Sequence, residues 1–341
     1  MDDATQDKLQ ELGDLELAIL VSLISGQHAI LFGPSNMTRD LGEEVRLLCN
    51  ATFGLRVATI DCSSKTTVDE FSQAVLIDVN DSFEDAVEQS GDNTRGALPA
   101  RVSSGSSPVY RSSIGNNHLD ERRVADVVVT TNLDLAAKDV QVQVLELLRT
   151  KRIFTHTAMH SAPRDLLFVA ILSKPGARLS IHLNDMFALS HFHTAEDGLP
   201  YLNGTAEPTA APTFSSQDVR ALRDLSTEVR LTGEVAAYLH NLVVFMRMSR
   251  YVKGGVTATA TRQLRALALA LAPLHGLDYV PPSLVALAAK KVYPNRLVLA
   301  TEANERSLQW GSDVEAIRLL LEGVTVEDVI EDVIRSVAPP L

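Results

Sequence analysis

The sequence predicts an α/β protein with a parallel-sheet core and an all-helical C-terminal domain. Short apolar or β-branched runs alternate with helical patterns in the first half, as they do in βαβ units. A Pro-rich stretch at residues 196–216 follows, and only helical periodicity appears beyond it. The length of 341 residues is about that of two domains.

The first βαβ unit begins with a predicted helix over residues 12–24, whose apolar side chains recur three and four positions apart. Residues 28–32 (HAILF) read as a buried strand that leads directly into a turn. A second helix is expected to carry Leu41, Val45 and Leu48, and residues 55–60 (LRVATI) form the next strand. A strand, turn, helix and strand in this order favour a parallel sheet.

The rest of the core is predicted from residues 125–131 (ADVVVTT), a strand buried on both faces, and from a helix over residues 139–150. Two further β-like runs, 152–159 and 166–172, are expected to form a hairpin or to pair as neighbouring strands. The core then spans residues 1–195. Its insertion at 79–123 is rich in Ser, Gly, Asn and charge, so we expect disorder there. Both a regulatory loop, phosphorylated near residues 103–107, and a tolerated surface insertion fit this composition.

The domain at residues 217–341 is predicted to be a helical lid that follows the 196–216 linker. Apolar stripes at helical spacing mark helices around residues 235–246, 264–274 and 284–291. Two short amphipathic helices are expected at 313–321 and 326–337.

Composition limits the class of partner. The formal charge is −12, from 31 Lys and Arg against 43 Asp and Glu, which disfavours binding to nucleic acid or anionic lipid. Two cysteines cannot form a disulfide framework or a four-thiolate zinc site. The acidic start of the chain has neither a signal nor a transit pattern, and nothing predicts a membrane span. We therefore expect a cytoplasmic or nuclear protein.

The turn after the first strand has the position of a phosphate-binding loop, whose pattern is G-x-x-x-x-G-K-[ST]. The candidate cofactor-binding residues there are Gly33, Pro34, Ser35, Asn36, Thr38 and Arg39. Only the first glycine fits, because Thr38 replaces the second glycine, Arg39 the lysine, and Asp40 the hydroxyl residue that would hold magnesium. ATP binding is thus expected to be weak or lost, with Mg²⁺ present only if ATP binds.

Hydrolysis also needs a carboxylate pair at the end of a neighbouring strand. After the VVV of residues 127–129 the chain has Thr130, Thr131 and Asn132, none of which is acidic. Asp134 is the single candidate catalytic residue, and it equally suits a helix cap or a partner of a helix dipole.

In segment order and in several strings the chain resembles the magnesium-chelatase I-subunit and MoxR branch of the AAA+ ATPases. Nearly the whole chain is covered apart from the insertion. In that family an Asn-Leu follows the second carboxylate motif, and a His-Pro-Ala hairpin, an arginine-finger string and two lid strings come later. The corresponding residues here are Asn132 with Leu133, 160–163 (HSAP), 184–187 (NDMF), 255–260 (GVTATA) and 276–281 (GLDYVP). The resemblance implies an AAA+ P-loop-type core, a helical lid, ATP with Mg²⁺, and homo- or hetero-oligomers of AAA+-type subunits.

This chain departs from the family at the catalytic positions. Met186 stands at the arginine-finger position, Thr259 at the lid's sensor arginine, and Ser173 or Lys174 at the polar sensor. Arg262, three residues beyond Thr259, is a candidate nucleotide-binding replacement. One hypothesis is a degenerate AAA+ protein that does not hydrolyse ATP and serves as an assembly or regulatory subunit. The alternative is an active chelatase-type or MoxR-type remodelling ATPase that uses Arg39, Asp134 and Arg262.

Two other patterns concern metal binding and nucleic-acid binding. His191 and His193 would share one face of a strand, but no completing ligand is apparent near them or near His156, His160 and His182, so no metal site is predicted. The basic string at residues 149–152 (RTKR) suits the C-terminal turn of a helix, and nucleic acid is not an expected partner.

Overall fold

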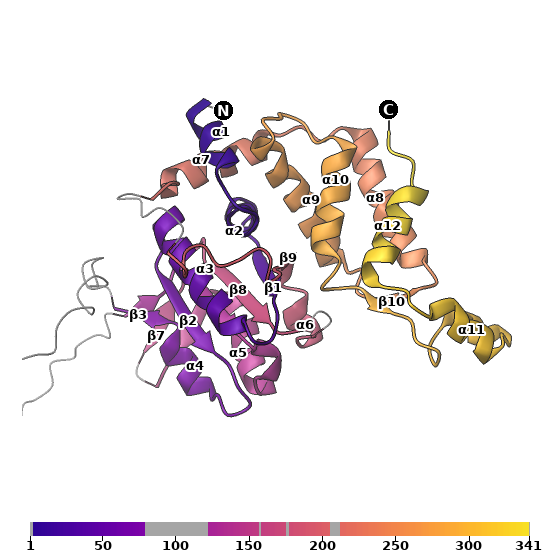
Figure 1. The fold of residues 1–341 in the computed structure, drawn as a ribbon, viewed down its shortest axis with the longest axis horizontal. Helices are drawn as coiled ribbons and strands as arrows, with labels where there is room; N and C mark the ends of the chain where they lie inside the picture. The colour runs from indigo at the N-terminus through magenta and orange to yellow at the C-terminus, as the bar shows by residue number, and fades with distance from the viewer. Residues whose placement is uncertain (1–2, 79–121, 157, 175–176, 205–211, 341) are drawn as a thin grey trace, which may run out of the picture.

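A computed structural model describes residues 3–78, 122–156, 158–174, 177–204 and 212–340. At its centre is a sheet of five parallel strands in the order β2-β5-β8-β1-β9 (Figure 1). The strands are β1 (His28–Phe32), β2 (Val57–Asp61), β5 (Val127–Thr131), β8 (Leu167–Leu172) and β9 (Phe187–Phe192). The predicted α/β class, with a parallel-sheet core and a helical C-terminal domain, is confirmed.

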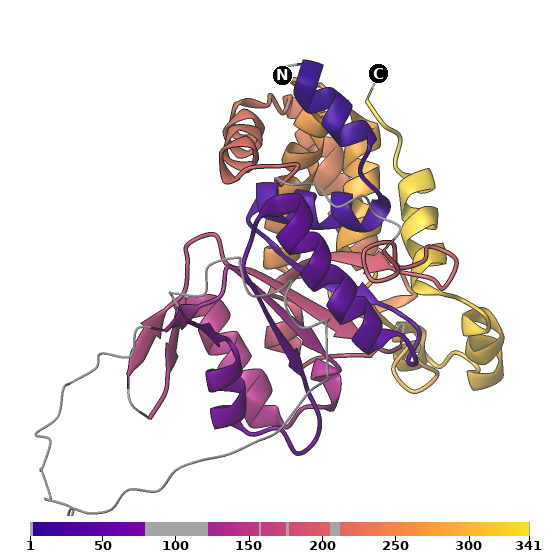
Figure 2. The same ribbon diagram turned by 60° about the vertical axis from the view of Figure 1, so that its left-hand side comes forward.

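Helices cover both faces of the sheet (Figure 2). On one face, Leu31, Val129 and Ile171 pack with α2 (Asp14–Ser25) and α3 (Thr38–Phe53). On the other, the alternating partners Ile30, Val128 and Ala170 pack with α4 (Val68–Ala74), α5 (Lys138–Thr150) and α6 (Ile181–Asn184). Strands that are apolar at every position therefore lie where both faces are covered.

Local sequence signals set the ends of the two helices that flank β1. The side chain of Glu16 accepts a hydrogen bond from the N–H of Gly13 at 2.7 Å, at the start of α2. Both helices end at a glycine in the left-handed region, Gly26 with φ 63° and Gly54 with φ 61°. The chain turns at these glycines into β1 and β2.

The predicted pairing of residues 152–159 with 166–172 is wrong. Instead, β6 (Arg152–Phe154) pairs with β7 (Met159–Ser161), and β8 joins the central sheet between β5 and β1. Every residue of β8 is buried, which explains why this run cannot form a half-exposed hairpin. The fifth strand, β9, lies within the predicted core at residues 1–195 but was not predicted as a strand.

Most of the predicted insertion, residues 79–121, lies outside the described residues. Its flanks are described: β3 (Leu76–Ile77) pairs antiparallel with β4 (Arg123–Val124). Arg123, placed in the insertion by the sequence analysis, therefore belongs to a strand. The described parts of the predicted linker are packed, with Leu199 and Phe214 buried against α3.

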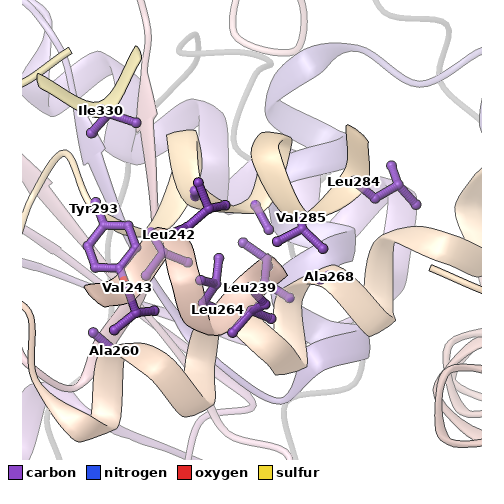
Figure 3. Close-up of a cluster of buried hydrophobic side chains, with 14 of the residues drawn as sticks. Leu239, Leu242, Val243, Ala260, Leu264, Ala268, Leu284, Val285, Tyr293 and Ile330 are labelled. Atoms are coloured by element: carbon purple, nitrogen blue, oxygen red, sulfur yellow. The ribbon is translucent and has the colours of Figure 1, made fainter. Parts of the chain in front are cut away.

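The C-terminal helices form a second core (Figure 3). Leu242, Leu264 and Val285 come from three different helices of this core, and Tyr293 is fully buried among them. The helices are α7 (Ser216–Glu228), α8 (Gly233–Met248), α9 (Ala258–Leu274), α10 (Pro282–Val292), α11 (Val314–Leu321) and α12 (Val326–Ser336). Two strands, β10 (Val252–Gly254) and β11 (Val298–Leu299), pair beside them, and the chain starts with α1 (Asp3–Gln10). No helix in the described part of the chain is long and apolar enough to cross a bilayer.

An ion pair between a buried arginine and a partly buried aspartate fastens the helical domain to the sheet. The guanidinium of Arg296, with its side chain 2% exposed, pairs with the carboxylate of Asp185 just before β9. Arg296 also donates to the backbone carbonyls of Asp185, at 3.1 Å, and of Phe187. The hydroxyl of Thr257, at the start of α9, donates to the same Asp185 carboxylate at 2.6 Å. One carboxylate thus joins β9, α9 and the segment after α10; we call this set the Arg296–Asp185 clamp.

Replacing Arg296 by Met is expected to lower the free energy of unfolding by about 2–3 kcal/mol, because the Asp185 carboxylate and two carbonyls lose their donor in a buried place. Chemical denaturation followed by circular dichroism measures this. The matched control is Arg335→Met, whose side chain is 77% exposed and pairs with Glu331, so its cost should stay below about 0.5 kcal/mol. Equal losses in the two variants would contradict the role of the clamp.

Candidate functional site

The candidate site lies where the carboxyl ends of the parallel strands meet. The segment from Gly33 to Met37 follows β1 as a tight turn, in which the N–H of Met37 donates to the carbonyl of Pro34 at 2.9 Å. The N–H of Gly33 donates to the carbonyl of Leu172 at 3.2 Å, which ties the turn to the end of β8. The turn therefore has the position of a phosphate-binding loop, between a buried strand and a helix start.

The start of α3 offers backbone donors to an anion. The first hydrogen bond of the helix runs from Leu41 to Met37, and no side chain caps the helix. The N–H groups of Thr38, Arg39 and Asp40 are therefore left without an intrahelical acceptor. Such donors favour a negative charge, but the exposed Asp40 carboxylate already places one in this first turn.

The predicted loop residues are brought together, with different accessibilities. Gly33 and Thr38 are buried, whereas Ser35, Asn36 and Arg39 are exposed and Pro34 is half-buried. The hydroxyl of Thr38 points back to the loop and donates to the carbonyl of Ser35 at 3.5 Å. Arg39 is therefore the one cation in the turn from Gly33 to Asp40, and its guanidinium faces solvent.

A carboxylate that sequence analysis missed lies beside the end of β5. Asp61 is the last residue of β2, and its Oδ1 accepts the Thr131 hydroxyl at 2.7 Å and the Asn132 amide at 3.2 Å. Asn132 has φ 54°, a left-handed conformation that asparagine tolerates. Only the order of the strands brings β2 next to β5, so residue spacing gave no signal for Asp61.

Asp134 lies in a short helical turn, Leu133–Leu135, directly after β5. Its Oδ1 atom is buried and has no hydrogen-bond partner. It does not cap α5, because the N-cap of that helix is Ala137. It lies in the first turn of the Leu133–Leu135 helix, and both its predicted catalytic role and the alternative of a partner of a helix dipole stay predictions.

Within one chain, Arg262 lies near the amino ends of the parallel strands, whereas the Gly33 turn lies at their carboxyl ends. Arg262 donates to the hydroxyl of Thr259 at 3.4 Å, within the first turns of α9. That end of α9 is held by Thr257 at Asp185, before β9 begins, whereas Gly33 follows the carboxyl end of β1. Ser173 and Lys174, in contrast, follow the end of β8 and so lie at the same edge as the turn.

The turn segment at residues 194–204 packs beside the candidate site. Its anchor is Glu44 of α3, a fully buried carboxylate that accepts the N–H groups of Tyr201 at 3.0 Å and Leu202 at 2.7 Å. The hydroxyl of Tyr201 donates to Glu16, and burial together with this contact raises the pKa of Tyr201 to about 12. These bonds fix the segment against α3, the helix that starts at the Gly33 turn.

The five histidines are not gathered at one point. His156 pairs with Asp69 at 3.0 Å on the surface, and His160 bonds to the carbonyl of Arg122 at 2.9 Å. His191 and His193 do lie together, with ring centroids 6.4 Å apart. Burial, with smaller contributions from Lys291 and His193, lowers the pKa of His191 to about 4. Within the described ranges no three His, Cys, Asp or Glu side chains are arranged to hold a metal ion.

No protein-family model and no curated protein sequence matches this chain. Among solved structures, a provisionally assigned ATPase from Cytophaga hutchinsonii aligns with 98% of this chain and 96% of its own, at a TM-score of 0.66 and 17% identity. The chain has the AAA+ ATPase fold. A full-length MCM homologue from Methanopyrus kandleri aligns with 85% of this chain and 58% of its own, at a TM-score of 0.46 and 15% identity. At 17% identity, the similarity to the Cytophaga hutchinsonii protein shows the AAA+ fold alone and assigns no activity.

The neutral His191 predicts a loss of stability in acid. Its folded pKa, about 4, is below the unfolded value of 6.5, so the unfolded chain binds the extra proton between these values. The contribution is complete above pH 6.5 and is lost toward pH 4, at up to roughly 1.4 kcal/mol per pH unit. The free energy of unfolding, measured by urea titration at several pH values, should fall less steeply over this range in His191→Gln than in the wild type. His156→Gln, at an exposed histidine, should keep the wild-type slope, and a slope unchanged in His191→Gln would contradict the assignment.

Proposed function

We propose that this chain is a magnesium-chelatase-like or MoxR-like AAA+ protein that does not hydrolyse ATP efficiently and serves as an assembly or regulatory subunit. The observation that carries the proposal is the end of β5. There, Thr131 and Asn132 stand where the carboxylate pair is required, and both donate to Asp61.

The side chains present do not fit the magnesium complex of a triphosphate. A magnesium ion is normally held by carboxylates together with phosphate oxygens. At this edge Asp61 accepts two hydrogen bonds through one oxygen, and Asp40 replaces the hydroxyl that would bind the ion. Nucleotide binding, where it occurs, depends on the N–H groups at the start of α3 and on Arg39, and it is weak because Asp40 repels phosphate.

The proposed role requires binding to partner subunits and does not require ATP hydrolysis. A AAA+ core with an attached helical domain can occupy a subunit position in a homo- or hetero-oligomer of AAA+-type subunits without hydrolysing ATP itself. The setting we propose is the cytoplasm or the nucleus.

One observation favours the alternative, an active remodelling ATPase: Asp134 has a buried carboxylate oxygen without a hydrogen-bond partner. Arg39, Asp134 and Arg262 would then have to act on one nucleotide. Arg262 lies near the amino ends of the strands, away from Arg39 and Asp134, and this argues against a shared nucleotide site within a single chain.

ATP turnover separates the two proposals. We expect the full chain with ATP and Mg²⁺ to release phosphate no faster than a protein-free control, and Asp134→Ala to behave in the same way. Turnover that is present in the wild type and absent in Asp134→Ala would overturn the first proposal in favour of the alternative. A measurement of mass in solution, made on the same sample with and without ATP, tests the proposed assembly.

Restoring the missing loop residues should restore binding. The triple substitution Thr38→Gly, Arg39→Lys and Asp40→Thr removes one negative charge and supplies the lysine and hydroxyl of a phosphate loop, so ATP affinity should rise at least about ten-fold. A titration with a fluorescent ATP analogue measures the change. The control Arg149→Lys, in the last turn of α5, should leave the affinity unchanged, and equal affinities in the triple variant and the wild type would show that the Gly33 turn is not the nucleotide site.

A further inference from the structure

A cavity of about 570 Å³ lies between the sheet and the helical domain. Its walls come from α1, α2, β9, α9 and α10, which are labelled in Figure 1. This volume is typical of sites for small molecules. None of the residues from Gly33 to Asp40 lines it, so the cavity is separate from the candidate nucleotide turn.

The walls of the cavity are mostly apolar. Leucines from every wall face it, among them Leu9, Leu17, Leu189 and Leu271. Leu9 and Leu189 belong to the buried cores of the protein, so the apolar lining continues the interior rather than the surface. An apolar occupant of this cavity would gain dispersion contacts with the leucines of its walls.

Six residues of the lining are polar, and of these His191 and Lys291 come from β9 and α10; the others are Gln6, Gln10, Asp14 and His275. His191 is 6% exposed, and its Nε2 atom is buried without a hydrogen-bond partner. Its low pKa keeps the ring neutral at pH 7, so His191 adds a polar but uncharged group to the wall of the cavity. Lys291 of α10 is half-buried, and its ammonium group pairs with no carboxylate among the described residues. Its backbone carbonyl accepts the Ser190 hydroxyl at 2.7 Å, which fixes this part of α10 beside β9.

The charges around the cavity limit what it can hold. Lys291 is the single cation in its lining, and Asp14 brings a negative charge to the rim. Asp197 and His193 are the other titratable groups that act on His191. Lys291 can pair with one carboxylate, whereas a polyphosphate would need several cations; Asp14 repels any anion at the rim, and it repels the more highly charged polyphosphate more strongly.

We propose that this cavity binds a small molecule with an apolar chain and a single carboxylate. The carboxylate is held by Lys291, and the chain lies among the leucines of α1, α2, β9 and α9. The site is independent of the proposed function, since no nucleotide-loop residue takes part.

The test is calorimetric titration of the full chain with dodecanoate below its micelle concentration. We expect saturable binding of one molecule per chain, weakened about ten-fold in Lys291→Met because one charge-assisted contact is lost. Leu271→Trp fills the cavity and should abolish binding, and Ala18→Leu, a milder filling on α2, should weaken it. The matched control is Lys290→Met: this neighbouring lysine pairs with Glu331 at 3.1 Å, does not line the cavity, and should leave binding unchanged.

Four outcomes would overturn the proposal: no saturable binding by the folded wild type, unchanged affinity in Lys291→Met, dodecanol binding as tightly as dodecanoate, or displacement of dodecanoate by ATP. Displacement would make the cavity part of the nucleotide site. Circular dichroism of each variant shows that it has folded, and Ala18→Leu keeps the test decisive if Leu271→Trp does not fold. Failure of dodecanoate binding leaves the ATP turnover and loop-restoration results, and hence the proposed function, untouched.

Discussion

The arrangement of the two parts of this protein depends on one partly buried carboxylate. Asp185 lies between α6 and β9 and receives both the guanidinium of Arg296 and the hydroxyl of Thr257. Burial lowers the pKa of Arg296, while the neighbouring Asp185 opposes that change and keeps the guanidinium charged. Because Arg296 also bonds to the carbonyls of Asp185 and Phe187, the first residues of β9 are held directly against the helical domain. The space between β9 and helices α9 and α10 follows from this attachment.

The same carboxylate gives residues 184–187 (NDMF), which resemble the arginine-finger motif of the family, a structural role. In the sequence, Met186 occupies the position of the arginine finger, so the comparison with the family shows only that this arginine is missing. In the structure, Asp185 has a structural partner inside the chain, and Met186 packs partly buried against the core. A string that resembles a catalytic motif thus contributes to domain attachment here. At the end of β5, similarly, Thr131 and Asn132 form hydrogen bonds with Asp61 rather than leaving a polar gap.

The sequence predicted those features that depend on neighbours along the chain. β1 is found at its predicted residues 28–32, and the helices of the second domain follow the predicted apolar stripes, because burial of one helix face is visible in periodicity. β8 was predicted to pair with residues 152–159 because its short apolar run carries no sign of which strands it pairs with. Asp61, Glu44 and Arg296 were missed for a related reason: their partners are between 70 and 158 positions away. Of the predicted nucleotide-binding residues, those of the Gly33 turn lie together because they are neighbours in the chain. The position of Arg262 depends instead on how α9 packs, which the sequence does not show.

The central claim is that the AAA+ shape is present while the groups that hold a magnesium ion on a triphosphate are not. A crystal structure grown with ATP and Mg²⁺ tests this most directly. The account predicts that no magnesium ion is held between the phosphates and the ends of β2 and β5, with Asp61 still bonded to Thr131 and Asn132. A magnesium-bound triphosphate in the Gly33 turn, contacted by Arg39 and by the carboxylate of Asp134, would contradict it.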